Sequence, residues 1–355
     1  MQRRIPCLYM RAGTSRGPFL DLRDLPGDRA ARDAVLLRIM GSPDAKQIDG
    51  LGGAAFVTSK VVMAQPSPRE GIDVDYVFAQ VMIDQPLVDY SATCGNMMTG
   101  VGPFAIEKGW VEAEDPETTV MVYDVNADAT IEIIVKTPEG QVNYGEGDLK
   151  IHGVPGQGAL VRLNMFDVAG GATGKLFPTG KRVESIQGLD VSIVDAGNLM
   201  MLVKAESVNL DGTEGKTFFE ENKALMTRLE AVRLEAGRRA GLGDVRERVI
   251  PKIGILSSPR NGGTIKSQYF TPHSLHPTHA VTGAICIATA SKAAGTVAAD
   301  LAQVTPAPSE KILIEHLAGF LPVHIEVSCE GDDFTVVRAG TLRTARKIMD
   351  GHVYY

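Results

Sequence analysis

Short apolar runs, interrupted by Gly, Pro and Asp, follow one another along most of the chain. Runs of this kind, rich in Val, Tyr, Phe and Thr, are typical of β-strands separated by turns. One of them, residues 129–137, partly alternates between apolar and polar positions, as in a sheet with one buried face. The pattern predicts strands over residues 5–10, 54–64, 73–83, 118–125, 129–137, 159–166, 191–197, 252–258, 264–270, 323–330 and 333–342.

Apolar residues at helical spacing mark two amphipathic segments, residues 28–41 and 215–243. The second carries charges on one face and ends at glycines, so we interpret it as a solvated helix packed on a domain. Two further segments have helical character but little charge: CGNMMTGVGPFAIEKG at residues 94–109 and PTHAVTGAICIATASKA at residues 277–293. A helix that is apolar all round must be buried on all sides.

These two buried segments also resemble each other. When Thr99-Gly100 is aligned with Thr282-Gly283, Cys94 meets Pro277, and the segments stand roughly half a chain apart. Sheet-like segments flank both, which indicates two similar halves, each a β-sheet wrapped around one central helix. A chance match between two Ala- and Gly-rich helices is the alternative.

Length and composition limit the classes of protein. A chain of 355 residues exceeds one ordinary hydrophobic core, so we expect two domains. The net charge of -7 and the lack of a basic cluster argue against a nucleic-acid partner. No apolar run approaches the ~18 residues that span a bilayer, and the N-terminus lacks the core of a signal peptide. We therefore expect a cytoplasmic protein without a membrane partner.

The thiols are few and scattered, without a CxxC pair, which indicates free cysteines and no disulfide framework. They are Cys7, Cys94, Cys286 and Cys329. In SATCGNMM, residues 91–98, Ser91 and Thr93 are types that begin helices by accepting bonds from free backbone N–H groups. Cys94 would then lie in the first helical turn, where the helix dipole favours the thiolate. A buried structural cysteine is the alternative.

A lysine in an apolar strand is the second candidate for chemistry. GLGGAAFVTSKVV, residues 50–62, carries Lys60 among Val and Met residues. Burial there lowers the pKa of a lysine toward the range of a general base. The alternative is an edge-strand lysine whose ammonium group reaches solvent. The Gly-rich turn lacks the spacing of a phosphate loop.

Three histidines, His273, His276 and His279, raise the hypothesis of a metal site. Prolines interrupt any continuous helix here, and no HExxH or Cys/His set accompanies them. We therefore predict no metal. We interpret the segment as the approach to the second buried helix, with Pro277 at its first position.

Four motifs, in this order, resemble one known family. They are MRAGTSRG (10–17), DGLGGAAFVTSKVV (49–62), SATCGNMMTGVGPFAIEKG (91–109) and HPTHAVTGAICIA (276–288). The family is that of the methylaconitate isomerases and 4-oxalomesaconate tautomerases, the PrpF family, which is related in fold to diaminopimelate epimerase. The resemblance covers nearly the whole chain.

The resemblance implies an α+β fold of two similar domains, each with antiparallel strands around a central helix, and an active site between them. We expect an N-terminal domain over residues 1–170 and a C-terminal domain over 171–342. The tail, about residues 343–355, is expected to return to the first domain. We also expect a homodimer.

The resemblance also implies cofactor-free proton transfer, with Cys94 and Lys60 as the acid/base pair. Epimerases of this fold use one cysteine at each central helix, whereas this chain has Pro277 at the second position. One thiol and one lysine instead suit a 1,3-allylic proton transfer between two carbons. Contacts to the substrate are expected from Arg11, Gly13, Thr14, Ser15, Gly95, Asn96, Met97, Lys266, Ser267, His276 and Thr278.

The substrate is expected to be a small di- or tricarboxylate, in the first place 4-oxalomesaconate from the ring cleavage of lignin-derived aromatics. The alternatives are the cis–trans isomerisation of 2-methylaconitate in propionate catabolism, and a non-catalytic partner of an aconitase-like dehydratase. Two departures leave this choice open. Arg11-Ala-Gly-Thr-Ser-Arg16 replaces the common Arg-Gly-Gly-Thr-Ser-Lys, and His316-Leu-Ala-Gly319 replaces a common His-Pro-Ser-Gly.

Overall fold

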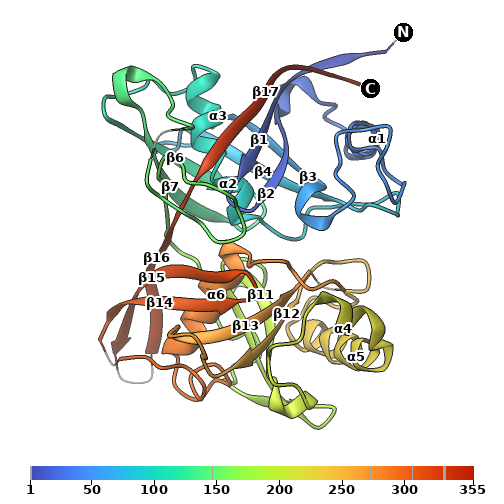
Figure 1. The fold of residues 1–355 in the computed structure, drawn as a ribbon, viewed down its shortest axis with the longest axis vertical. Helices are drawn as coiled ribbons and strands as arrows, with labels where there is room; N and C mark the ends of the chain where they lie inside the picture. Colours follow the sequence, from blue (N-terminus) through green and yellow to red (C-terminus); the bar gives the residue numbers. More distant parts are fainter. Residues whose placement is uncertain (1, 146, 272, 306, 331–332) are drawn as a thin grey trace. The chain divides into compact units, whose positions relative to one another are not determined.

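The computed structural model describes residues 2–145, 147–271, 273–305, 307–330 and 333–355. The chain divides into two compact units (Figure 1). Unit 1 comprises Met1–Asn164 and Leu342–Tyr355, and unit 2 comprises Met165–Thr341. The structure therefore places the two domain boundaries after Asn164 and Thr341, and the sequence predicted them after residues 170 and 342.

Unit 1 is built on a strand series in which antiparallel and parallel pairings alternate, beginning with an antiparallel pair. The series is β1 (Arg4–Ala12), β2 (Ser15–Asp21), β3 (Lys60–Pro66), β4 (Val74–Val81), β6 (Glu117–Asp124) and β7 (Ala129–Lys136). The short β5 (Val88–Asp89) also pairs with β4. The tail strand β17 (Ala345–Tyr354) runs antiparallel to β1, so the end of the chain returns to unit 1 (Figure 1).

Unit 2 repeats the same series of pairings. Its strands are β10 (Leu189–Ala196), β11 (Asn198–Lys204), β12 (Lys252–Ser257), β13 (Ile265–Phe270), β14 (Ser309–His316) and β15 (Gly319–Glu330). β9 (Glu184–Ile186) and β16 (Asp333–Arg343) flank this series, and β8 (Val161–Met165) lies where the two units join in sequence. The predicted duplication is therefore confirmed at the level of topology.

The sheets are mixed, not wholly antiparallel as predicted. Parallel neighbours need a long crossover connection, usually helical, and each parallel step here has one. α1 (Arg29–Met40) joins β2 to β3, and α4 (Lys216–Glu221) and α5 (Lys223–Arg239) join β11 to β12. The other two crossovers are the central helices.

The central helix of unit 1 is interrupted. The sequence predicts one helix over residues 94–109, but the structure has α2 (Gly95–Met98) and α3 (Val101–Glu107). Pro103 explains the break, because it has no N–H for the Thr99 carbonyl and its ring crowds that group.

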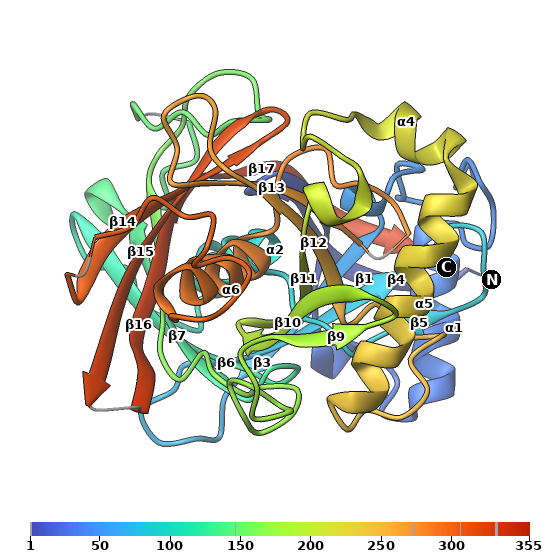
Figure 2. The same cartoon turned by 90° about the horizontal axis from the view of Figure 1, so that it is seen from below.

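The central helix of unit 2, α6 (Val281–Lys292), is continuous, and strands enclose it (Figure 2). It begins four residues later than predicted, so placing Pro277 at its first position was wrong. Ala280 is still extended, with φ −78° and ψ 140°. The Thr278 N–H donates to the His276 Nδ1 over 3.0 Å, and this local bond holds the preceding turn outside the helix.

The outer helices pack on the other sheet faces. Leu36 and Ile39 of α1 join a buried cluster with Val61 and Met63. The predicted helix over residues 215–243 splits at Asn222, whose side chain caps α5. In the part of the chain that the structure describes, every helix is too short or too polar to cross a membrane.

Candidate active site

The two residues expected to handle protons meet in unit 1. Lys60 is the first residue of β3, and Cys94 directly precedes α2. The Lys60 Nζ lies 3.6 Å from the Cys94 Sγ, and each residue is 5% exposed. The solvent-reaching alternative for Lys60 is therefore wrong. The structure places an amine and a thiol, two groups that exchange protons, in direct contact.

The surroundings of Lys60 fix its ammonium group. Gln80 stands opposite on β4, and its Oε1 accepts a bond from Nζ over 3.1 Å. The Gln80 amide in turn donates to the Ser59 carbonyl over 2.8 Å, which sets its orientation. Nζ also lies 4.8 Å from the ring centre of Phe56 and 5.0 Å from that of Phe78. Burial lowers the pKa of Lys60, and the electrostatic and hydrogen-bonding interaction with Cys94 opposes this change.

Buried polar side chains hold the backbone at Cys94. The Tyr76 hydroxyl donates to the Cys94 carbonyl over 3.2 Å. The Thr93 hydroxyl donates to the Asp124 carboxylate at the end of β6. Burial raises the pKa of Asp124 to about 7, although the Thr93 hydroxyl bond acts to lower it. Cys94, not Thr93, is the N-cap residue of α2, so the capping role predicted for Thr93 was wrong.

The turn between β1 and β2 packs against Asn96 of α2. Gly13 has φ +53°, and a Cβ there would lie 2.1 Å from the Asn96 Oδ1, so glycine is required. The Thr14 N–H donates to the same Oδ1 over 3.2 Å. The Ser15 Oγ is buried and has no hydrogen-bond partner among the described residues. The predicted Gly13-Thr14-Ser15 motif thus adjoins the start of α2.

Gly95 and Met97 are buried within α2. The Met97 methyl group packs against Gly17 of β2, where a Cβ would lie 3.3 Å from it and 1.9 Å from the Lys60 carbonyl oxygen. Gly17 therefore allows β2 and β3 to approach at the lysine. Met97 has a packing role, and any contact it makes with a ligand would come from its backbone.

Arg11 lies on β1. It lines a pocket of about 530 Å³ together with Arg16 and Arg346. Lys60 and Cys94 are not among the described residues that line this pocket. The structure therefore groups Arg11 with other arginines, apart from Lys60 and Cys94.

A second polar group precedes α6 in unit 2. The His279 Nε2 lies 3.1 Å from the Ser267 Oγ, and its Nδ1 lies 2.8 Å from the Ala280 carbonyl oxygen. Because a carbonyl only accepts, Nδ1 carries the proton, and in the neutral ring Nε2 accepts from the serine. His276 and Thr278 are bonded to each other in the same turn. This turn precedes the central helix of unit 2, as Cys94 precedes that of unit 1.

Lys266 points away from this group. Successive strand residues face opposite sides of a sheet, and Ser267 faces the His279 side. Lys266 is instead opposite Glu315 of β14. Burial acts to raise the pKa of Glu315, but bonds from backbone N–H groups and the charge of Lys266 hold it below its ordinary value. Lys266 and Ser267, both expected from the sequence to contact the substrate, therefore face opposite sides of the sheet.

The three histidines go to different places. The His273 Nδ1 lies 3.7 Å from a Glu230 carboxylate oxygen of α5. The rings of His276 and His279 instead pack on Tyr269, with centres 5.9 and 4.8 Å away. Within the described ranges, no three His, Cys, Asp or Glu side chains form a group that could hold a metal.

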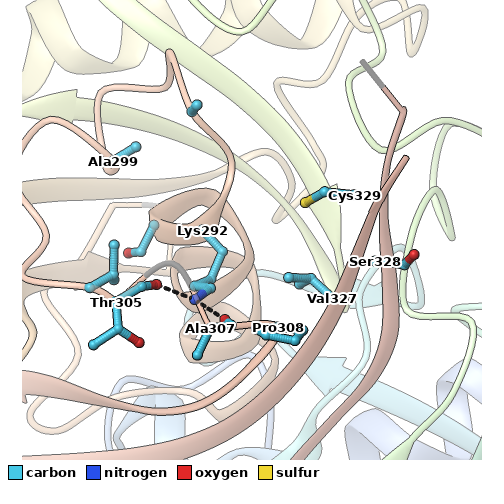
Figure 3. Close-up of a pocket in the computed structure, with 11 residues that line it drawn as sticks. Lys292, Ala299, Thr305, Ala307, Pro308, Val327, Ser328 and Cys329 are labelled. Carbon is cyan, nitrogen blue, oxygen red and sulfur yellow. Dashed lines mark hydrogen bonds between the residues drawn. The ribbon is translucent and has the colours of Figure 1, made fainter. Parts of the chain in front are cut away.

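Unit 2 also contains a pocket of about 810 Å³ beside the end of α6 (Figure 3). The Lys292 ammonium donates to the carbonyls of Thr305 and Ala307, each over 2.6 Å, and to the Glu310 carboxylate over 3.1 Å. These bonds use all three of its N–H groups, so we assign Lys292 a structural role. Cys329 lines the same pocket and is exposed.

Three comparisons identify similar proteins. The family model described as PrpF protein matches residues 2–355. The 4-oxalomesaconate tautomerase of Pseudomonas putida is 44% identical over 352 residues, which cover 99% of this chain and 96% of that protein. The crystal structure of a methylitaconate-delta-isomerase has a TM-score of 0.78 at 37% identity, covering 99% of this chain and 96% of that one.

A hydroxyproline epimerase from Agrobacterium vitis has a TM-score of 0.61 at 13% identity, over 100% of this chain and 94% of that one. This likeness concerns the fold alone. It confirms the predicted epimerase-like α+β architecture of two similar domains.

Proposed function

We propose that this chain, which belongs to the PrpF family, is a cofactor-independent isomerase that moves a proton along the allylic system of 4-oxalomesaconate. The observation that carries the proposal is the buried 3.6 Å contact between the Lys60 Nζ and the Cys94 Sγ. The tautomerase of Pseudomonas putida, 44% identical to this chain, supports the choice of substrate. The reaction would serve the ring-cleavage catabolism of aromatic compounds.

In the proposed reaction Cys94, as a thiolate, removes a proton from a carbon next to a carbonyl or carboxylate group. The C–H electron pair forms the new double bond of a dienolate. The Lys60 ammonium then gives a proton to the far carbon of the allylic system, and the double bond has moved by one position. A thiol and a neutral amine remain. Their 3.6 Å contact lets the thiol proton pass to the amine, which restores the starting pair.

Both proton transfers would take place on one face of the substrate. Two groups in hydrogen-bonding contact approach a planar dienolate from the same side. Their burial also excludes bulk water from the reacting carbons. We therefore assign a suprafacial course to the transfer.

Polar groups near the start of α2 would hold the substrate's carboxylates and the charge of the dienolate. They are the Ser15 hydroxyl, the Asn96 amide and the backbone N–H groups of the first turn of α2. These groups do not need a metal ion to supply positive charge.

Turnover of 4-oxalomesaconate and of 2-methylaconitate, followed by proton NMR, tests the proposal. We expect kcat/KM for 4-oxalomesaconate to be higher by at least about tenfold, which corresponds to about 1.4 kcal/mol of transition-state discrimination. Exhaustive chelation should leave the rate unchanged. The matched controls are Cys329→Ala and Lys46→Met, because both of these residues are exposed and should keep full activity.

The outcomes separate the alternatives. Preference for 2-methylaconitate would identify a cis–trans isomerase instead. Binding of these acids without deuterium entering them from heavy water would indicate the non-catalytic partner. Loss of activity on chelation, with recovery on adding one divalent metal, would overturn the cofactor-free mechanism.

A further inference from the structure

Three arginines lie side by side across three neighbouring strands of unit 1. Arg11 of β1 is directly opposite Arg16 of β2 and directly opposite Arg346 of β17. Residues opposite each other on paired strands project from the same face, with Cβ atoms about 5 Å apart. One sheet face therefore carries a row of three guanidinium groups.

Three neighbouring arginines without a negative partner destabilise the folded state. Like charges directly opposite on a sheet are destabilising. Burial, and then the charge of Arg346, lower the pKa of Arg11 to about 10. The Arg16 Nε is buried and has no hydrogen-bond partner among the described residues. Acidic side chains are absent from the described residues that line this pocket.

The pocket over the row has a second, apolar wall. Its volume is about 530 Å³, within the usual range of small-molecule sites. Leu149, Ile151, Val154 and Pro155 line it together with the arginines. Guanidinium groups bind carboxylates in a bidentate manner, and the apolar wall suits a carbon skeleton. Inorganic phosphate would match the arginines but not this wall.

The row also faces away from the proton-handling pair. Met10, the neighbour of Arg11 on β1, faces the other side of the sheet and lies near Gly100, between α2 and α3. Gly17 alternates with Arg16 on β2 and lies near Met97 of α2. The arginines therefore project from the sheet face opposite the central helix.

We propose that the pocket lined by Arg11, Arg16 and Arg346 is a binding site for a small polycarboxylate, separate from the Lys60–Cys94 centre. This goes beyond the proposed isomerase activity and does not depend on it. Arg11 is already anchored, since its Nη1 donates to the Gly13 and Thr344 carbonyls. Arg16 and Arg346 therefore supply the adaptable contacts.

Isothermal titration of the full chain with citrate, at low ionic strength, tests the site. Arg346→Gln should weaken citrate binding by at least about tenfold, the equivalent of one charge-assisted contact. Arg4→Gln is the matched control, since Arg4 is exposed at the other end of β1 and its loss should leave the affinity unchanged. Arg346 is itself exposed, so the substitution should not unfold the protein. The citrate-dependent rise in Tm gives a second reading of the same difference.

Two further measurements decide the assignment. Equal affinity for citrate in Arg346→Gln, Arg16→Gln and Arg4→Gln would overturn the site. Inorganic phosphate binding as tightly as citrate would overturn the polycarboxylate assignment. Alkylation of Cys94 by iodoacetamide tests the separation of the two sites. Protection of Cys94 by citrate that disappears in Arg346→Gln would place the arginines in the catalytic centre and overturn a separate site.

Discussion

Single substitutions at Cys94 and Lys60, the two residues proposed to handle protons, should separate their roles. Cys94→Ala and Lys60→Met should each abolish net isomerisation, because neither proton transfer alone completes the reaction. In heavy water, each variant should lose deuterium entry mainly at a different carbon of the recovered substrate, measured by NMR. Cys329→Ala should behave as wild type, since this thiol is exposed in unit 2.

The contact between the two groups modifies that expectation. The sequence predicts that the thiol and the lysine serve two different carbons. The structure places the Lys60 Nζ within 3.6 Å of the Cys94 Sγ, so each group also reaches close to the partner's carbon. Slow residual exchange at the second carbon is therefore expected in each variant. Loss of exchange at one and the same carbon in both variants would contradict the 1,3-transfer.

Thiol labelling gives a second test at this scale. Cys94 should react with iodoacetamide faster than Cys7 and Cys286, because burial raises the pKa of both these thiols. Cys329 is exposed and should also react, so speed alone does not identify the site. A substrate-like tricarboxylate should protect Cys94 and leave Cys329 unprotected. Labelling of Cys94 that is slow and insensitive to ligand would favour a structural cysteine.

The amide of Gln80 should tune the pH range of activity. It accepts a bond from the Lys60 ammonium, and such a bond favours the charged form. Gln80→Leu should therefore lower the pKa of Lys60 further, beyond the effect of burial. Since the ammonium donates the proton, the alkaline fall of kcat should move to lower pH. Gln80→Glu should move it to higher pH, and unchanged profiles in both variants would contradict this role.

Sequence reasoning singled out Cys94 and Lys60, which the structure brings into contact, but not the residues around them. Cys94 and Lys60 stand out because a thiol at a helix start and a lysine among Val residues are unusual local patterns. Gln80 and Tyr76 lie on β4 and Asp124 ends β6, so their contacts with Lys60, Cys94 and Thr93 depend on strand register and on long-range packing. A buried polar residue in an apolar strand, such as Gln80, is the one signal that marks them beforehand.

At the scale of elements, the bond between Thr93 and Asp124 ties the end of β6 to the start of α2. Burial raises the pKa of Asp124 to about 7. The folded protein therefore keeps a proton that the unfolded chain loses, so the free energy of unfolding should fall as pH rises from about 4 to 7. Asp124→Asn should remove this fall, on the order of a few kcal/mol.

Urea unfolding of both proteins at several pH values measures the difference. Asp124→Ala is the complementary variant, because it leaves the Thr93 hydroxyl and the Asn126 N–H without their buried acceptor. Compared with Asp124→Asn, which keeps a buried acceptor and likewise does not titrate, it should lower the free energy of unfolding by about 1–3 kcal/mol at every pH. A stability difference between wild type and Asp124→Asn that does not vary with pH would contradict the raised pKa.

The sequence predicted most of the strands that the structure describes but missed β2, β5, β9, β11, β14 and β17. β5 and β9 are only two and three residues long, too short to leave a pattern. The other four each have a physical reason. β2 contains Gly17-Pro18, a pair typical of turns, and β17 is largely exposed and carries alternating polar residues. β11 is an apolar run that periodicity cannot distinguish from a buried helix, and β14 carries several charged positions.

At the scale of the whole molecule, the chain builds most of unit 1, then unit 2, and finally returns to complete unit 1. The last strand, β17, pairs with β1 over nearly its full length, from Arg4 opposite Tyr354 to Ala12 opposite Ala345. A repeat of two similar folds would not require this return. Unit 1 thus depends on a segment that follows unit 2 in sequence.

One buried thiol in each unit can report on this dependence. Cys7 lies on β1 opposite Gly351 and belongs to a core cluster with Val353. Cys286 is buried in α6 of unit 2. A chain ending at Thr344 loses β17, so it exposes one edge of β1 and part of this core.

In the chain ending at Thr344, Cys7 should become reactive to iodoacetamide, while Cys286 should stay unreactive because unit 2 keeps all its strands. Mass spectrometry of the labelled peptides measures both thiols in one sample. A chain ending at Val353 is the control, since it keeps the core residue of β17 and should leave Cys7 unreactive. Equal exposure of Cys7 and Cys286 would mean that the two units unfold together, and continued protection of Cys7 would mean that unit 1 does not need its last strand.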